Sequence, residues 1–208
     1  IKTRERGFEP GLGLLDQIKR NRTGPTLRLA QAERGGTGAD HDPLTGACNR
    51  LAFPDELAVA AKNAGPDDPV SLVAIDLDHF KPVNDEGGHL LGDDLLGRLS
   101  DLLTQSVRQS DTVARLGGDE FGIILPACGQ QRAVELAENI RAGIEALRIE
   151  QDGKTFGVTA SIGLTEICDS DSGPREVVAR ADEGTYAAKA RGRNCVVTMS
   201  LPLRQEPD

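Results

Sequence analysis

The sequence RLGGDEFGIIL at residues 115–125 has the pattern of a β-hairpin that carries acids at its turn. The apolar run TVARL at 112–116 precedes the turn and EFGIIL at 120–125 follows it, which predicts two antiparallel strands. Gly117 and Gly118 remove side chains where a ligand would approach the backbone. One interpretation of this turn is structural, with glycines for geometry and surface acids for solubility. The other interpretation is a binding site.

A second group of acids stands at the end of an upstream strand. The run VSLVAIDL at 70–77 is typical of a buried strand, and Asp76 and Asp78 stand at its end. A carboxylate there costs desolvation free energy unless it is paired. If the hairpin is a neighbour of this strand, Asp119 and Glu120 approach Asp76, and a hard cation relieves the repulsion. Mg²⁺ prefers a few carboxylates together with substrate phosphates, and two such ions activate a hydroxyl and stabilise a leaving pyrophosphate.

The pattern outside these acids predicts an α+β fold, with one central, mainly antiparallel sheet flanked by helices. The clearest helical signal is a stripe of leucines at 91, 95, 96, 99, 102 and 103. The expected order is α-β-α-β-β-α-β-α-β. Its helices are 51–64, 90–107, 130–147 and 174–191, and its strands are 70–77, 112–116, 120–125, 155–167 and 195–199.

Composition argues against several classes of function. The 24 basic and 33 acidic residues give a net charge of −9, which disfavours bulk binding to nucleic acid or anionic lipid. Aromatic residues make up only 3% and Trp is absent, so the core must be aliphatic and a stacking platform for single strands is not expected. The four cysteines form no CxxC motif, which predicts reduced thiols. No apolar run approaches the roughly 18 residues of a transmembrane helix.

Charge and periodicity divide the chain into three parts. Residues 1–40 carry a net charge of +3 and lack sustained periodicity, whereas the remainder carries −12. We expect 1–40 to be a linker or the tail of an upstream regulatory region, with a basic docking arm as the alternative. The regular pattern predicts a domain at 41–199, followed by a C-terminal tail at 200–208. Because the first residue is Ile, we expect the chain to be cut out of a longer protein.

Five ordered blocks between residues 42 and 197 resemble the signatures of the GGDEF family, the diguanylate cyclases that join two GTP into cyclic di-GMP. The blocks are DPLTGACNR (42–50), DLDHFKPVNDEGGHLLGDDLL (76–96), RLGGDEF (115–121), TASIGLT (159–165) and ADEGTYAAKARGRN (181–194). The resemblance implies a palm-like nucleotidyl-cyclase fold, Mg²⁺ with Mn²⁺ as a substitute, and activity across a homodimer. It also implies a bacterial cytoplasmic location, either alone or as the cytoplasmic part of a longer, membrane-tethered protein.

By this resemblance, the acids form the metal site and the catalytic centre. Asp76 and Asp119 are expected to bind Mg²⁺ through their carboxylates, and Leu77 through its carbonyl oxygen. Glu120 is expected either to bind the metal or to activate the 3′-hydroxyl, and the resemblance leaves both roles open.

The same blocks imply a binding site for GTP. Asn84 and Asp93 occupy the guanine-reading positions, where Asp accepts hydrogen bonds from the N1–H and N2–H₂ edge. Gly117 and Gly118 are expected to lie against the nucleotide. Three basic side chains match positions that hold the triphosphate, where positive charge offsets phosphate charge: Lys81, Lys189 and Arg193.

The segment from Arg108 to Asp111 resembles the family's RxxD product-inhibition site, which grips the guanines of bound cyclic di-GMP. A second RxxD at 98–101 lacks the spacing from the hairpin. The alternative is a structural pair of a helix-end Arg with a strand-start Asp. Asn139 stands where family members often carry a further Arg, and Arg141 is expected to point elsewhere, so the site is expected to be weaker than usual.

Other residues of the blocks are expected to be structural. Asp78 is expected to cap a helix, and Arg50 to form an ion pair or cap with Asp42 near the first helix. Phe80 is expected in the core beneath the nucleotide loop, and His89 is expected to make a structural hydrogen bond.

The sequence therefore predicts a diguanylate cyclase, a nucleotidyltransferase that condenses two GTP into cyclic di-GMP and releases pyrophosphate. A catalytically silent GGDEF module that senses GTP or cyclic di-GMP, or docks a partner, is the alternative. Loss of a signature acid would favour that alternative, and none is lost. A cyclase for a different dinucleotide is disfavoured by Asp93.

Overall fold

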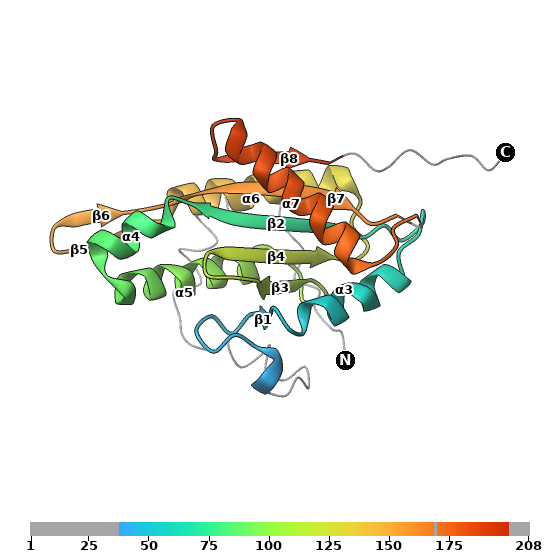
Figure 1. Cartoon of the computed structure of the whole chain (residues 1–208), viewed down its shortest axis with the longest axis horizontal. Coiled ribbons are helices and arrows are strands. Elements are labelled where there is room, and N and C mark those ends of the chain that lie inside the picture. The colour runs from blue at the N-terminus through green and yellow to red at the C-terminus, as the bar shows by residue number, and fades with distance from the viewer. Residues whose placement is uncertain (1–37, 169, 200–208) are drawn as a thin grey trace, which may run out of the picture.

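The computed structural model describes residues 38–168 and 170–199, and Figure 1 shows how their elements are arranged. Residues 1–37 of the predicted linker or upstream tail lie outside the described residues, and so does the whole of the predicted tail at 200–208. The described chain begins with a short 3-10 helix, η1 (Gly38–Asp40).

A six-stranded sheet runs through the centre, with strand order β1-β3-β4-β2-β7-β8 (Figure 1). Its strands are β1 (Cys48–Asn49), β2 (Ser71–Asp78), β3 (Thr112–Arg115), β4 (Glu120–Leu125), β7 (Thr159–Glu166) and β8 (Cys195–Thr198). The pairings β3–β4, β4–β2 and β2–β7 are antiparallel, whereas the edge strands β1 and β8 pair in parallel. The sheet is mainly antiparallel, which confirms the predicted α+β fold class.

Helices cover both faces of the sheet. One face packs against α5 (His89–Ser106) and α6 (Gln130–Ala146), and the other against α3 (Phe53–Lys62) and α7 (Pro174–Ala190). The alternation along β2 serves both cores, because Ile75 enters the first and Ala74 the second. Burial on both faces explains why β2 is a nearly continuous apolar run. None of the helices in the described ranges combines the length and apolar composition needed to cross a membrane.

The apolar pattern did not predict three features of the fold. Strand β1 has only two residues, too few for any periodicity. A separate helix, α4 (Phe80–Gly87), precedes α5, and Gly88 at φ 82° separates the two. The predicted strand 155–167 is wrong in its first part. There β6 (Lys154–Phe156) pairs with β5 (Ile149–Gln151) in a separate two-stranded sheet.

Arg180 anchors α7 to the end of β7. Its guanidinium donates to both carboxylate oxygens of Asp171, at 2.6 and 2.9 Å, and its Nε donates to Thr165 Oγ1 at 2.6 Å. Both charged side chains are nearly buried. Burial by itself would raise the pKa of Asp171, but hydrogen bonds from Arg180 and the Cys168 amide hold the pKa below its usual value. This ion pair orders the loop that leads into α7.

Two glycines bring α7 unusually close to β7. A Cβ at Gly163 would collide with the Ala181 carbonyl oxygen and would lie 2.6 Å from the Thr185 amide nitrogen. A Cβ at Gly184 would lie 2.7 Å from the Cα of Gly163. Because these neighbours are backbone atoms, no flexible side chain can yield, and glycine is required. The close approach sets the height of α7 above the sheet.

We expect Gly163→Ala to lower the free energy of unfolding by about 1–3 kcal/mol, because the added methyl must push α7 off the sheet. Gly97→Ala is the matched control, since a Cβ at Gly97 has open space around it. Ala is favoured over Gly in a helix interior by about 1 kcal/mol, so this control should be more stable than the natural chain. Urea unfolding followed by circular dichroism measures both variants. Unchanged stability of Gly163→Ala would contradict the close packing.

Candidate active site

The two acidic strand ends meet at one end of the sheet. The antiparallel register of β2 and β4 places Asp76 directly opposite Glu120. The Leu77 amide donates to the Asp119 carbonyl oxygen at 3.2 Å, which extends the pairing into the hairpin turn. The backbone pairing therefore brings the four residues for which the sequence predicts metal binding to the same end of the sheet.

Arg115 holds the hairpin turn in place. Its Nε donates to the Gly117 carbonyl at 3.1 Å, and its Nη2 donates to the Gly118 carbonyl at 2.9 Å. Its Nη1 donates to Asp42 Oδ1 at 3.1 Å. One guanidinium thus fixes both glycines of the turn, and it ties the turn to the loop that precedes β1.

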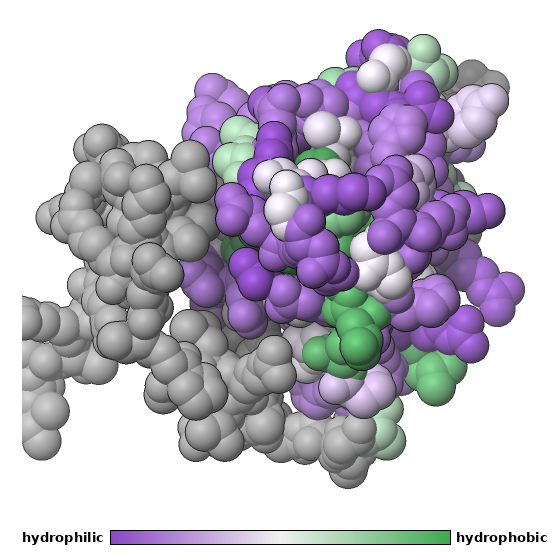
Figure 2. Space-filling view, turned by 90° about the vertical axis from the view of Figure 1, so that its left-hand side faces the viewer, coloured by the Kyte–Doolittle hydropathy of each residue, from purple (hydrophilic) through white to green (hydrophobic). Residues whose placement is uncertain are grey.

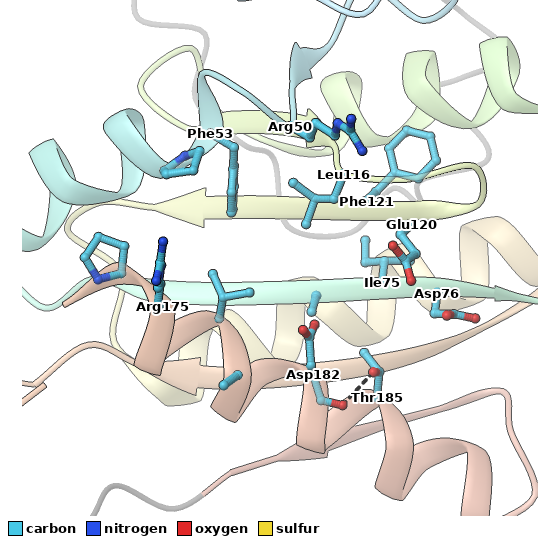
Figure 3. A pocket seen from close by; sticks show the side chains of 15 residues that line it. Arg50, Phe53, Ile75, Asp76, Leu116, Glu120, Phe121, Arg175, Asp182 and Thr185 are labelled. Carbon is cyan, nitrogen blue, oxygen red and sulfur yellow. Dashed lines mark hydrogen bonds between the residues drawn. The ribbon is translucent and has the colours of Figure 1, made fainter. Parts of the chain in front are cut away.

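The predicted ion pair of Asp42 with Arg50 is wrong. The parallel pairing of β1 with β3 brings the loop of Asp42 beside Arg115, and the Asp42 carboxylate also accepts hydrogen bonds from the amide and hydroxyl of Thr45. Arg50 is exposed and points toward a cleft beside the acids (Figure 3).

This cleft has a volume of about 450 Å³ and lies between α3, α7 and the sheet (Figure 3). Its apolar lining includes Phe53, Ala74, Leu116 and Val178. Its charged lining consists of Asp76, Glu120, Asp182, Arg50 and Arg175. Sequence reasoning did not single out Asp182 or Arg175. The block at 181–194 contains Asp182, but only the fold shows that it faces Asp76 from α7.

The acids at the cleft form a region of excess negative charge. Burial and the carboxylates of Asp76, Asp119 and Asp182 raise the pKa of Glu120, and Lys189 opposes this effect. Burial and Asp76 likewise raise the pKa of Asp182. Lys189 reaches from α7 to donate from Nζ to Asp76 Oδ2 at 2.6 Å. A cation therefore already lies against the acid at the end of β2.

The acids fit a divalent metal ion in charge and in donor type. Carboxylates and the Leu77 carbonyl offer the hard oxygen ligands that Mg²⁺ prefers, and the Lys189 ammonium lies where positive charge is favoured. Within the described residues, no three acidic, histidine or cysteine side chains converge closely enough to hold a metal by themselves. A complete coordination shell would therefore include oxygens from a ligand.

Asn84 lies against Gly92, the residue before Asp93, because α4 packs tightly on the start of α5. A Cβ at Gly92 would collide with Asn84 Oδ1 and would lie 3.2 Å from the Cζ of Phe80. Phe80 is buried beneath this contact, as expected. Lys81 is exposed in the first turn of α4. The end of the molecule that carries α4 presents mainly hydrophilic side chains (Figure 2).

Asp78 does not cap a helix, so that prediction is wrong. The strand continues through Asp78, which is paired with Thr159 of β7, and its carboxylate accepts hydrogen bonds on the face of the sheet. His79 is the N-cap of α4, in a left-handed conformation. The predicted structural hydrogen bond of His89 is wrong, because its exposed side chain at the start of α5 makes no hydrogen bond in the described part of the chain. Arg193 lies beyond α7, with Nε 3.9 Å from Asp78 Oδ1.

The RxxD segment lies at the other end of β3 from the acidic turn. Asp111 is buried and accepts hydrogen bonds from the Arg108 amide at 2.7 Å and the Ser110 hydroxyl at 3.1 Å, so its carboxylate holds its own turn. Arg108 and Asn139 are exposed. Arg141 points elsewhere, toward Glu138, Glu145 and Asn194.

The fold and the site define an α+β domain of the palm-like type, with acids on two neighbouring strands. Residues 39–195 match the family model described as "Diguanylate cyclase, GGDEF domain". The chain therefore belongs to the GGDEF-domain family.

Among curated relatives, a probable diguanylate cyclase, DgcE of Escherichia coli (strain K12), is 40% identical over 159 residues, covering 76% of this chain and 14% of that protein. Diguanylate cyclase DgcP of Pseudomonas aeruginosa is 39% identical over 155 residues, covering 74% and 23%. The chain thus spans less than a quarter of either relative. The GGDEF domain of DgcB from Caulobacter crescentus, solved in complex with c-di-GMP, superposes with a TM-score of 0.73 at 32% identity, over 78% of this chain and 94% of that one.

We expect Arg115→Lys to loosen the acidic turn, because one ammonium replaces a guanidinium that donates in three directions. The amides of Leu116 and Gly117, which donate to the Glu120 carbonyl, should exchange hydrogen about ten- to a hundredfold faster, the equivalent of one lost charged hydrogen bond. Arg98→Lys is the control, since Arg98 makes only a half-exposed pair with Asp94. Equal exchange in the two variants would show that Arg115 does not hold the turn.

The ion pair of Asp42 with Arg115 predicts a dependence of stability on pH. Burial would raise the pKa of Asp42, but hydrogen bonds from Thr45 and Arg115 bring the pKa below its usual 3.8. A carboxyl whose pKa is lowered by folding stabilises the fold above its unfolded pKa, and this contribution is lost as the pH falls through the folded value. Urea midpoints of the natural chain should therefore fall more steeply below about pH 4 than those of Asp42→Asn. Parallel curves would contradict this.

Proposed function

We propose that this chain is a diguanylate cyclase, which joins two GTP into cyclic di-GMP with release of pyrophosphate. The observation that carries the proposal is the pairing of Asp76 with Glu120 on neighbouring strands, with Asp119 beside them. Relatives named diguanylate cyclase support it, as does the solved GGDEF domain with bound c-di-GMP. We assign the activity to residues 41–199 and its location to the bacterial cytoplasm.

In this proposal, Asp76, Asp119 and the Leu77 carbonyl hold Mg²⁺, with Mn²⁺ as a substitute. When bound, the ion supplies positive charge to the triphosphate and to the reacting oxygens. Lys189 then moves from Asp76 to a phosphate oxygen. Lys81 and Arg193 add positive charge to the same group, because charge-assisted hydrogen bonds to phosphate are strong.

The bond-forming step needs two nucleotides. Each 3′-hydroxyl oxygen attacks the α-phosphorus of the other GTP, the bond to the β-phosphate oxygen breaks, and pyrophosphate leaves. Glu120 either accepts the hydroxyl proton or completes the metal site.

Two copies of the chain are proposed to supply the two nucleotides. Asn84, which lies against Gly92, and Asp93 both follow the end of β2, and in this proposal they read the guanine of the one GTP that each copy holds. The cleft lined by Arg50 and Arg175 opens beside the acids on the opposite side, along β2. It leaves space beside Asp76 and Glu120 for a nucleotide held by the second copy.

Loss of either signature acid should abolish product formation. We expect Asp119→Ala and Glu120→Ala to lower turnover at least about a hundredfold, the usual contribution of a positioned acid or base. Chelation of the divalent metal should abolish turnover in the natural chain. Glu183→Gln is the control, because Glu183 is an exposed acid of α7 that does not line the cleft. Product is measured by chromatography. Near-normal turnover of either variant would overturn the proposal, and GTP binding without product would favour a silent sensor module.

The guanine-reading pair predicts a preference for GTP over ATP, because adenine offers no N1–H to Asp93 and leaves the carboxylate unpaired. Asp93→Asn should weaken GTP binding about ten- to a hundredfold, the value of one charged hydrogen bond. Gly92→Ala should weaken it as well, because the added methyl displaces Asn84. Gly97→Ala on the same helix is the control. Equal affinity for ATP and GTP in competition binding would exclude this role.

We also propose product inhibition at the RxxD segment. Arg108 is its exposed member, whereas Asp111 is engaged in its own turn, and Asn139 lacks a guanidinium. Arg108→Ala should relieve inhibition by cyclic di-GMP without lowering turnover. Asn139→Arg should strengthen it about ten- to a hundredfold. Titration of the product into both variants measures this. Unchanged inhibition of Arg108→Ala would leave the segment a purely structural turn.

A further inference from the structure

Asp78 is a buried acid that no step of the proposed reaction uses. Its side chain has no exposed surface, although it stands only two residues after Asp76. A carboxylate in such a place is costly unless donors surround it. The hydroxyls of Thr159 and Ser161 donate to it at 2.8 and 2.7 Å, and the backbone amide of Asn194 donates at 3.1 Å. Because these donors enclose it, Asp78 differs from Asp76 and is a poor metal ligand.

The donor from Asn194 belongs to a turn with unusual backbone geometry. After α7 ends, Gly192, Arg193 and Asn194 have φ values of 106°, 68° and 48°. A left-handed conformation is tolerated by Asn but is unfavourable for Arg, and two in succession persist only where neighbouring contacts hold them. The hydrogen bond from the Asn194 amide to Asp78 is one such contact. The Arg193 amide, which donates to the Ala188 carbonyl at 3.0 Å, is another.

A third contact ties the same turn to α6. The Asn194 side chain donates to Glu145 Oε1 at 2.9 Å and accepts a hydrogen bond from Arg141 at 2.8 Å. The turn is therefore held from beneath by Asp78 and from the side by α6. Of these holders, Asp78 also forms an ion pair with the side chain of Arg193.

The Arg193 side chain extends from this turn over the carboxylate. Its Nε lies 3.9 Å from Asp78 Oδ1, and the side chain remains 47% exposed. Asp78 and Arg193 thus form a looser second acid–base pair beside that of Asp76 and Lys189, with the acid two residues further along β2 and the base in the turn after α7. In the pair of Asp78 and Arg193, the acid is buried and the half-exposed base is able to reach a ligand.

We infer that Asp78 is a positioning residue, which holds the turn after α7 in its left-handed conformation and so directs the Arg193 guanidinium toward the nucleotide phosphates. This inference rests on the proposed function, because it takes GTP as the ligand of Arg193. Asp78 acts through Arg193, without touching the metal or the substrate.

The test is a double-mutant cycle on the full chain with GTP and Mg²⁺. Asp78→Asn removes the charge that faces Arg193, and it should raise KM for GTP about tenfold while kcat changes less than about threefold. Arg193→Ala should have a similar effect alone, and little further effect in the Asp78→Asn background, because the two residues act as one unit. Effects that multiply in the double variant would overturn the inference. So would a loss of kcat at unchanged KM.

Asp171→Asn is the matched control. It removes the charge of another nearly buried carboxylate, which lies just before the start of α7 and pairs with Arg180 of that helix. It should lower the melting temperature as Asp78→Asn does, with no change in KM. An equal rise in KM in this control would show that general loosening of α7 explains the effect, and would overturn the inference.

Should Asp78→Asn fail to fold, Ser161→Ala replaces it. That variant keeps the charge and removes one donor, and it should raise KM for GTP about threefold without adding to Arg193→Ala. An unchanged KM would overturn the inference. Calorimetric titration with GTP and Mg²⁺ distinguishes a failure of the proposed function from a failure of the inference about Asp78. A natural chain that neither binds nor converts GTP contradicts the proposed function and the inference together. A natural chain that is active while Asp78→Asn matches it contradicts the inference alone.

Discussion

The antiparallel register of β2 and β4 is the constraint on which the rest of the site depends. It places Asp76 opposite Glu120, and like charges directly opposite on neighbouring strands destabilise a sheet. The arrangement is tolerated because other elements compensate for it. Lys189 brings positive charge from α7, and Arg115 fastens the turn that carries the second acid. A cluster of acids that is unfavourable in isolation is thus stabilised by two basic side chains.

The fold class was predictable because the long elements carry strong signals. The leucine stripe of α5 and the buried run of β2 each span enough residues for their period to be recognised. The missing elements are short. β1 has two residues, and α4 ends at a pair of glycines before its pattern can repeat. The β5–β6 hairpin has a local signal, Asp152-Gly153 with both φ values positive, which is the usual two-residue hairpin turn.

The sequence predicts a set of site residues, but it does not predict the contacts that those residues make. The signature blocks indicate which acids and bases matter, and the structure brings the acids together. The partners of those residues depend on contacts between distant segments. Asp42 meets Arg115 across 73 positions, and Asp78 meets Asn194 across 116. Asp78 was mistaken for a cap because a helix follows it. Only strand pairing shows that the sheet continues through it.

The Arg115 guanidinium connects the acidic turn with the Asp42 loop on its other side. The loop at Asp42 follows directly after η1, where the described chain enters the domain. From that loop, a single side chain leads to the carbonyls of both glycines in the acidic turn. Two contacts therefore connect the start of the described domain with the acidic turn: one from Asp42 to Arg115, and one from Arg115 to the glycine carbonyls. A displacement of the Asp42 loop would therefore be transmitted to the acidic turn through a single side chain, that of Arg115.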